Sequence, residues 1–213
     1  MSFINEDKLA IHTVAAAAYR VLRDLLEKRG VDDFADTIRA GLFSMAKDLV
    51  SGTLSENARK VLAADEHLKG VIAATAEVIR QHGGEADIDV ILPRSTVRIS
   101  HEKRRSHLES LCKSANFLKH ADRDHLAAIK LDDVDNDLLI VSASAAYTML
   151  SHDMTAEMAV FYALTCVTKP EQFEATDALL AHMVKALSPL SAGRRRRACV
   201  RMVKNWNTVL GGA

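Results

Sequence analysis

The residues best suited to chemistry lie in one short stretch, Lys113 to Asp124, which combines an amide, an imidazole, cations and carboxylates. Its candidate residues are Lys113, Asn116, Lys119, His120, Asp122 and Arg123. A histidine transfers protons near neutral pH, and lysine or arginine can hold a phosphate. Asn116 and His120 are therefore candidate catalytic residues, and the other four are candidate binding residues.

The helix that must position these residues is predicted to begin at Ser106, because Glu109 follows three residues later as in a capping box. It is expected to reach 119 or 121. Asn116 and His120 are four residues apart, so their side chains are neighbours on such a helix. A structural reading stays open, because a histidine in a last turn also interacts well with exposed carbonyls and the helix dipole.

A second group of polar residues, His12, Tyr19 and Arg23, lies along one side of a helix predicted over 6–29. We expect its core face to be the apolar stripe formed by Ile11, Val14, Ala15, Ala18, Leu22 and Leu25. The polar side is either a solvated or helix-pairing face, or one wall of a polar cleft opposite Asn116 and His120. In the second case it would bind a ligand.

A run of basic residues, Arg194 to Arg197, precedes Arg201 and Lys204. Positive charge at the start of a helix opposes the helix dipole. The run is either solvated or neutralised by an acidic surface of this protein, a second subunit or a phosphate backbone.

Metal sites and cofactor motifs are not predicted. The calcium-like run Asp133, Asp135 and Asp137 lacks the required glycine and the closing glutamate, because Leu138 and Ser144 occupy those positions. The three cysteines form no CxxC pair, and the neighbouring histidines 101, 107, 120 and 125 have no four-residue ligand spacing. There is no GxGxxG motif and no P-loop.

The composition predicts an all-α, single-domain protein over 1–213. Apolar residues make up 48% of the chain, with only nine glycines and three prolines, whereas an all-β protein needs many more turn residues. Seven to eight helices are expected, over 6–29, 34–50, 55–82, 106–121, 136–150, 155–167, 170–187 and 195–210. The alternating residues near 87–99 predict either a small β-hairpin or an extended crossover.

Charge and terminal sequence predict a cytoplasmic protein. The 28 basic and 28 acidic residues cancel, so any nucleic-acid contact would have to be local. The first residues lack the basic start and apolar run of a signal peptide, and no apolar stretch reaches the roughly 20 residues that span a bilayer.

The order Asn116-x-x-x-His120 on a late helical turn resembles the signature of the HEPN superfamily of small helical bacterial and archaeal proteins. This resemblance implies a dimeric, metal-independent ribonuclease of toxin–antitoxin or defence type, with His120 as the family's histidine and Asn116 as its polar residue. The family's arginine corresponds to Ala115 here. The stretch is also similar to that of uncharacterised bacterial all-α proteins.

Two functions follow as expectations. The first is a non-enzymatic helical bundle that binds a protein partner or forms a homodimer. The second is an HEPN-like ribonuclease, or its degenerate relative, that acts on RNA.

Overall fold

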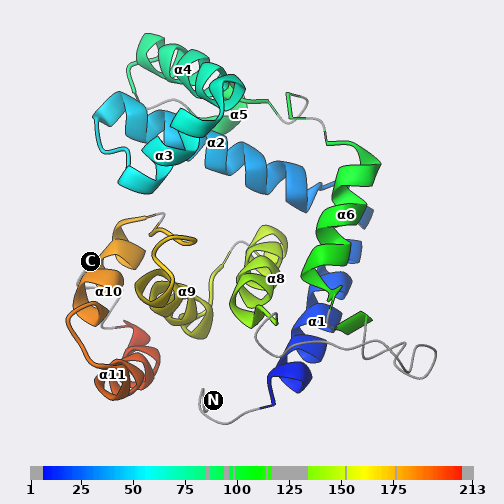
Figure 1. Ribbon diagram of the computed structural model, residues 1–213, viewed down its shortest axis with the longest axis vertical. Helices are drawn as coiled ribbons and strands as arrows, with labels where there is room; N and C mark the ends of the chain where they lie inside the picture. Colours follow the sequence, from blue (N-terminus) through cyan, green and yellow to red (C-terminus); the bar gives the residue numbers. More distant parts are fainter. Residues whose placement is uncertain are drawn as a thin grey trace. The chain divides into compact units, whose positions relative to one another are not determined.

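The computed structural model describes residues 7–84, 87–93, 96–97, 99–113, 115–116, 134–151, 153–175 and 177–207. Within these residues the chain is helical and contains no strand (Figure 1). The helices are α1 (Lys8–Lys28), α2 (Asp33–Ser51), α3 (Glu56–Ala64), α4 (Glu66–Gln81), α5 (Ile88–Ile91), α6 (His101–Leu111), α8 (Asn136–Ser151), α9 (Ala156–Thr168), α10 (Ala178–Leu187) and α11 (Ala192–Lys204). The prediction of an all-α protein is confirmed.

The chain divides into two compact units. Unit 2 comprises Gly30–Arg105 and is inserted between the two segments of unit 1, Met1–Arg29 and Ser106–Ala213. An ion pair between Asp32 and Arg104 joins the two ends of unit 2. The prediction of one domain over 1–213 is not decided by this division and stays a prediction.

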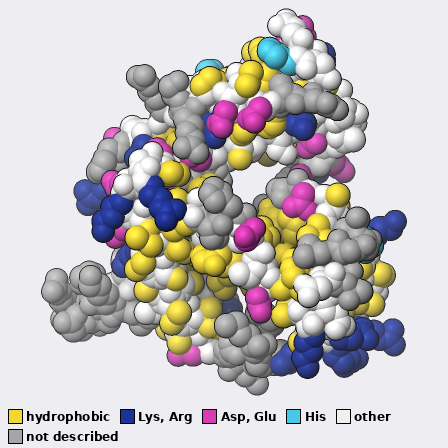
Figure 2. Space-filling model, turned by 180° about the vertical axis from the view of Figure 1, so that it is seen from behind, with side chains coloured by type: hydrophobic (Ala, Val, Ile, Leu, Met, Phe, Trp, Pro, Cys, Tyr) yellow, Lys and Arg dark blue, Asp and Glu magenta, His cyan; other side chains and the backbone are white. Residues whose placement is uncertain are grey.

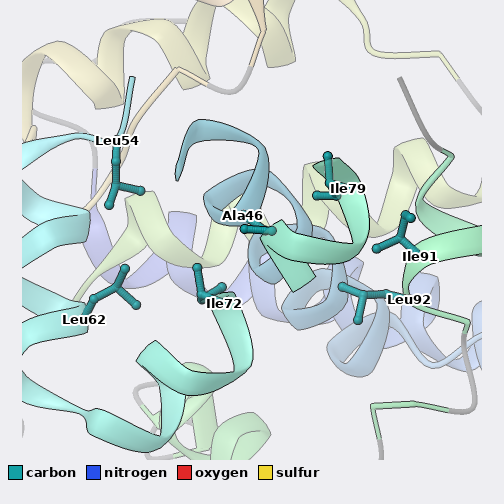
Figure 3. Packing of buried hydrophobic residues seen from close by; sticks show 8 residues of the cluster. Ala46, Leu54, Leu62, Ile72, Ile79, Ile91 and Leu92 are labelled. Atoms are coloured by element: carbon teal, nitrogen blue, oxygen red, sulfur yellow. The ribbon is translucent and has the colours of Figure 1, made fainter. Parts of the chain in front are cut away.

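Unit 2 has its own hydrophobic core, which α2, α3, α4 and α5 enclose (Figure 3). Its buried residues are Ala46, Leu54, Leu62, Ile72, Ala76, Ile79, Ile91 and Leu92. The buried Arg39 on α2 ties this core to α5, because it pairs with Asp89 and donates to the carbonyl of Leu92. Burial of this guanidinium is tolerated because Nη1 meets a carboxylate and a carbonyl oxygen.

In unit 1, α1 and α8 lie side by side and run in the same direction. Near their first turns, Asn136 donates to the carbonyl of Lys8 at 3.0 Å. Near their ends, Arg29 donates to the carbonyl of Leu150 at 3.0 Å. A parallel pair is possible because the chain between them contains the whole of unit 2.

The carboxyl-terminal part of unit 1 packs α9, α10 and α11 around a second core. It is formed by Ala159, Val160, Ala163, Leu180, Met183, Leu187, Ala198 and Cys199. α9 carries no charged residue from Met158 to Thr168, as expected of a helix that is covered on most sides.

Several helix boundaries differ from prediction because an unrecognised residue caps the helix. Asp65 is extended and accepts from the backbone N–H of Leu68, which divides the predicted helix 55–82 into α3 and α4. Ser100 accepts from Lys103 N–H, so α6 begins before the predicted capping box at Ser106. Asp177 likewise caps α10, which begins at 178 and not at 170.

The hairpin near 87–99 is not confirmed. Ile88–Ile91 form a short helix, and the carboxylate of Asp87 accepts from Asp89 N–H at its start. An aspartate at this position favours a helical turn over a strand, because its side chain satisfies a free N–H group. The end of α1 is confirmed, since Gly30 takes a φ of 71°, which glycine adopts without steric cost.

Candidate functional site

The face of α1 that packs into unit 1 combines His12 and Tyr19 of the predicted polar group with the apolar residues Ala16 and Leu26. These four residues are buried. Of the predicted apolar core face, Val14, Ala18 and Leu25 are exposed, whereas Ile11, Ala15 and Leu22 are half-buried. The predicted core face is thus only partly buried, and the polar side, for which a helix-pairing face was one expectation, packs against a neighbouring helix because its polar residues find partners there.

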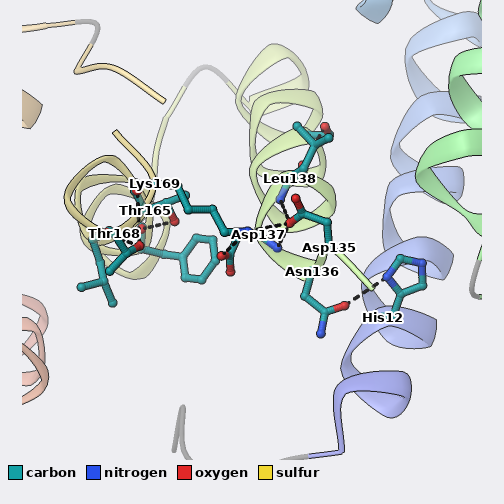
Figure 4. A network of polar contacts seen from close by, with 11 residues as sticks. His12, Asp135, Asn136, Asp137, Leu138, Thr165, Thr168 and Lys169 are labelled. Atoms are coloured by element: carbon teal, nitrogen blue, oxygen red, sulfur yellow. Dashed lines mark hydrogen bonds and ion pairs between the residues drawn. The ribbon is translucent and has the colours of Figure 1, made fainter. Parts of the chain in front are cut away.

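His12 finds such a partner in α8. Its Nδ1 lies 3.0 Å from Oδ1 of Asn136, whose Nδ2 donates to the carbonyl of Lys8 (Figure 4). The amide oxygen is thus the acceptor, so Nδ1 of His12 carries the proton. The other ring nitrogen, Nε2, is buried and has no hydrogen-bond partner in the described part of the chain.

Asn116 is held by α1. The Nη2 group of Arg20 donates to Oδ1 of Asn116, and Asn116 N–H donates to the carbonyl of Cys112 at 2.9 Å. Burial raises the pKa of the Cys112 thiol, and the charges of Arg20 and Arg23 offset only part of this effect. The thiol is therefore protonated at neutral pH and is a poor nucleophile.

A charged network lies where α8 begins (Figure 4). Oδ1 of Asp135 accepts from Asp137 N–H and Leu138 N–H, each at 3.1 Å, so Asp135 caps α8. Lys169, just after α9, reaches Asp135 at 3.0 Å and Asp137 at 2.9 Å. Burial alone would raise the pKa of Asp135, but the hydrogen bond from Leu138 and the contact with Lys169 outweigh it and lower the pKa.

For Lys169 the balance runs the other way. Burial alone would lower its pKa, but hydrogen bonds to Asp137 and Asp135 raise it. Within the calcium-like run, Asp135 thus caps α8, and Asp135 and Asp137 both form ion pairs with Lys169. No group of three histidine, cysteine, aspartate or glutamate side chains suited to a metal ion occurs among the residues that the structure describes.

The outward side of α1 is an exposed stripe formed by Val14, Ala18, Val21 and Leu25. These residues are spaced four, three and four positions apart, so they follow one line along the helix. Hydrophobic side chains form an open band on the surface where α1 lies (Figure 2). Alanines 10 and 17, also exposed, border the stripe.

The predicted site residues are distributed as follows. Lys119, His120, Asp122 and Arg123 lie outside the described residues. Lys113 is exposed and Asn116 is half-buried, and both follow α6, which ends at Leu111. His12 and Tyr19 are buried, and Arg23 is half-buried. The polar cleft between α1 and the pair Asn116 and His120 stays a prediction.

Residues that sequence reasoning missed are Asn136 and Lys169, together with the role of Arg20. Each acts across more than thirty positions of the chain. No local pattern could have revealed them, because their partners are set by the packing of α1, α8 and α9. Only Arg20 had a signal, since it lies beside the predicted polar stripe.

Comparisons with protein-family models, curated proteins and solved structures gave no match to this chain. None of the described helices combines the length and the apolar character needed to cross a bilayer.

Proposed function

We propose that the protein is a non-enzymatic helical protein that self-associates through the exposed stripe of α1. The observation that carries this proposal is the exposure of Val14, Val21 and Leu25, which are 70%, 60% and 44% exposed on a helix whose other face is packed. Single exposed apolar residues are common on proteins, whereas a continuous stripe of them marks an interaction surface.

A second copy of the same helix suits the stripe. Alternating spacings of three and four residues are those of helices that pair along a common line. The stripe spans about 16 Å from Val14 to Leu25, at about 1.5 Å per residue. The bordering alanines let a second helix approach closely, and a two-fold arrangement places the same stripe on both sides of the interface.

The uncharged character of α8 supports an apolar contact in this region. From Leu138 to Leu150 it contains no charged residue, yet of these residues only Leu139 and Ala146 are buried. A helix without charged residues over such a length is normally covered on most sides. Pairing through α1, which lies beside α8, would cover more of this surface.

The test is the molar mass in solution, measured by light scattering and by sedimentation at about 50 µM, a concentration at which a micromolar dimer is formed. Wild type is expected at twice the mass of one chain. Val21→Glu removes one buried valine from each copy, or about 3 kcal/mol in total at about 1.5 kcal/mol per valine. That loss weakens the dimer at least about 100-fold.

The matched control is Val61→Glu on α3, where a valine is also exposed, at 46%. This variant should dimerise like wild type. A monomeric wild type would reject self-association, and a different protein would then be the candidate for covering α1. Equal weakening by both substitutions would show that the negative charge acts without regard to the stripe.

An HEPN-like ribonuclease is the second candidate, and one observation favours it. Position 115 is alanine, but Arg20 of α1 donates to the side chain of Asn116. A guanidinium thus stands beside the polar residue of the signature, although it comes from another helix. In this reading His120 assists attack of the ribose 2′-hydroxyl, Asn116 orients it, and a basic residue among Lys113, Lys119 and Arg123 holds the phosphate.

This candidate predicts cleavage of labelled RNA in the presence of a chelator. His120→Ala should lower the rate at least about 100-fold, the usual effect of losing a proton-transfer group. Arg20→Gln should also lower it, because the guanidinium that holds Asn116 is lost. Arg59→Gln, an exposed substitution on α3, is the control. Each variant is checked for folding by circular dichroism. Absence of cleavage by wild type leaves the non-enzymatic proposal as the only one of the two.

A further inference from the structure

A second surface has an unusual concentration of positive charge. On α11, Arg194, Arg197, Arg201 and Lys204 are all exposed and are spaced three, four and three positions apart. They form one side of the helix, which we call the arginine face. The opposite side is fixed in the core of unit 1, because Ala198 and Cys199 are buried there. The direction of the arginine face is therefore set by packing.

The charge around this face is one-sided. Residues 178–213 contain seven lysines and arginines and no aspartate or glutamate, so the excess of acids lies elsewhere in a chain of zero net charge. The structure gives Arg194, Arg197, Arg201 and Lys204 no ion pair with any residue that it describes. Figure 2 shows this gathering of basic side chains at one edge of the molecule.

One arginine of the run has a different role. Arg195 donates to the carbonyls of Leu187 and Ser188, at 3.2 and 3.3 Å, and so caps the end of α10. Arg195 therefore has a structural role in the fold. This role does not account for the positive charge of the four exposed residues of the arginine face.

The surface beside the arginine face is hollowed. A cavity of about 580 Å³ opens there. Its lining consists of Leu190, Arg194, Arg196, Arg197, Val200 and Arg201. A hollow edged by guanidinium groups suits a ligand that carries several negative charges. The start of α11 adds to this, since Ser191 makes no side-chain hydrogen bond to the first turn, and the dipole favours an anion there.

We infer that the arginine face of α11 binds the phosphodiester backbone of a nucleic acid. Guanidinium groups match phosphate geometry through paired hydrogen bonds. From Arg194 to Lys204 the four cations extend about 15 Å along the helix at about 1.5 Å per residue. One strand of a duplex places about four phosphates over the same rise, at about 3.4 Å each.

The other polyanions fit less well. A helix that lies on a lipid surface needs a broad apolar side to insert, but the apolar side of α11 is buried and Val200 is the one strongly apolar residue exposed on it among those described. A protein interface is depleted of charge at its centre, whereas charge is the main feature of this face.

The test is fluorescence anisotropy with labelled single-stranded RNA, single-stranded DNA and duplex DNA of about 20 nucleotides, which exceeds the span of the face. Chelator is present and His120→Ala is used as the parent, so that RNA cleavage does not interfere. Four phosphate contacts predict that the logarithm of the association constant falls with the logarithm of salt with a slope of about −3 for single strands.

The triple variant Arg194→Gln, Arg197→Gln and Arg201→Gln should lose at least about tenfold in affinity at low salt, and its slope should fall to about −1. The matched control removes the same charge elsewhere, through Arg59→Gln, Lys60→Gln and Lys69→Gln on α3 and α4. It should bind like the parent. Circular dichroism and melting curves check both folds.

Comparable binding of RNA and DNA, or a preference for either one, supports the inference, because both carry the same backbone. No binding at low salt would overturn it, as would an equal loss in the control. Tighter binding of polyglutamate or of phosphatidylserine vesicles than of any nucleic acid would assign the face to an acidic protein or a lipid surface. The Val21→Glu variant should still bind, so failure of the α1 proposal is distinguishable.

Discussion

At the residue scale, a polar contact links α1 to α8. His12 is buried, and its Nδ1–H meets the amide of Asn136, while Nε2 has no partner among the described residues. A buried polar atom without a partner costs about 1–3 kcal/mol. The hydrogen bond of Nδ1 to Asn136 offsets part of that cost. The packed face of α1 thus combines one polar contact with the burial of Ala16, Tyr19 and Leu26.

The ion pair of Asp135 and Lys169 predicts a stability that depends on pH. The folded pKa of Asp135 is lowered, so its contribution is present above the unfolded pKa of about 3.9 and is lost as the pH falls through the folded value. We expect Asp135→Asn to lose about 0.5–1 kcal/mol relative to wild type at pH 7, a magnitude discounted because the side chain is 39% exposed.

Chemical denaturation at neutral pH and near pH 3 measures this difference. Asparagine still caps α8, so the substitution isolates the charge, and the stability gap should narrow towards the acid end. Glu102→Gln, an exposed substitution on α6, controls for loss of a carboxylate and should show no gap at either pH. A gap of equal size at both pH values would contradict the assigned role of the carboxylate.

At the scale of elements, helices were predictable and their orientation was not. α8 and α9 lie within a residue or two of prediction, because their caps and apolar runs are local properties. The boundaries at Asp65 and Asp177 were missed, since an aspartate within a helical pattern is read as a surface residue until its φ and ψ are known. A capping residue acts on N–H groups within three positions, so the signal is local. A sequence contains many residues of the capping type, however, and does not show which of them begins a helix.

The facing of α1 shows where local reasoning ends. Val14 and Leu25 belong to an apolar line, and His12 and Tyr19 to a polar one, so the sequence alone favours burying the first. The partner that favours the second, Asn136, is 124 positions from His12. Part of the apolar line, Val14 and Leu25, remains on the surface together with Val21. The proposed self-association rests on these exposed residues.

At the scale of the whole molecule, acidic and basic residues are unevenly distributed along the chain. The excess of acids lies before residue 178, and the arginine face lies after it. A net charge of zero excludes a general attraction to nucleic acid but permits a local one. The candidate surfaces on α1 and α11 share no residue. Each can therefore be removed by substitutions that leave the other intact.

Two separate cores predict two unfolding transitions. Ile72 lies in the core of unit 2 and Met183 in a core of unit 1, and both are fully buried. Replacing such a residue by alanine costs about 2–5 kcal/mol. We expect calorimetry to show two transitions, with Ile72→Ala lowering one of them and Met183→Ala lowering the other.

The measurement requires one fixed protein concentration, because self-association through α1 would stabilise unit 1 by mass action. Val61→Ala, at an exposed position of α3, is the control and should change stability by no more than about 0.5 kcal/mol. A single transition lowered by both core variants would establish one cooperative domain over 1–213. Independent shifts would instead mean that unit 2 is an inserted domain, because its core would then unfold without the core that holds α11.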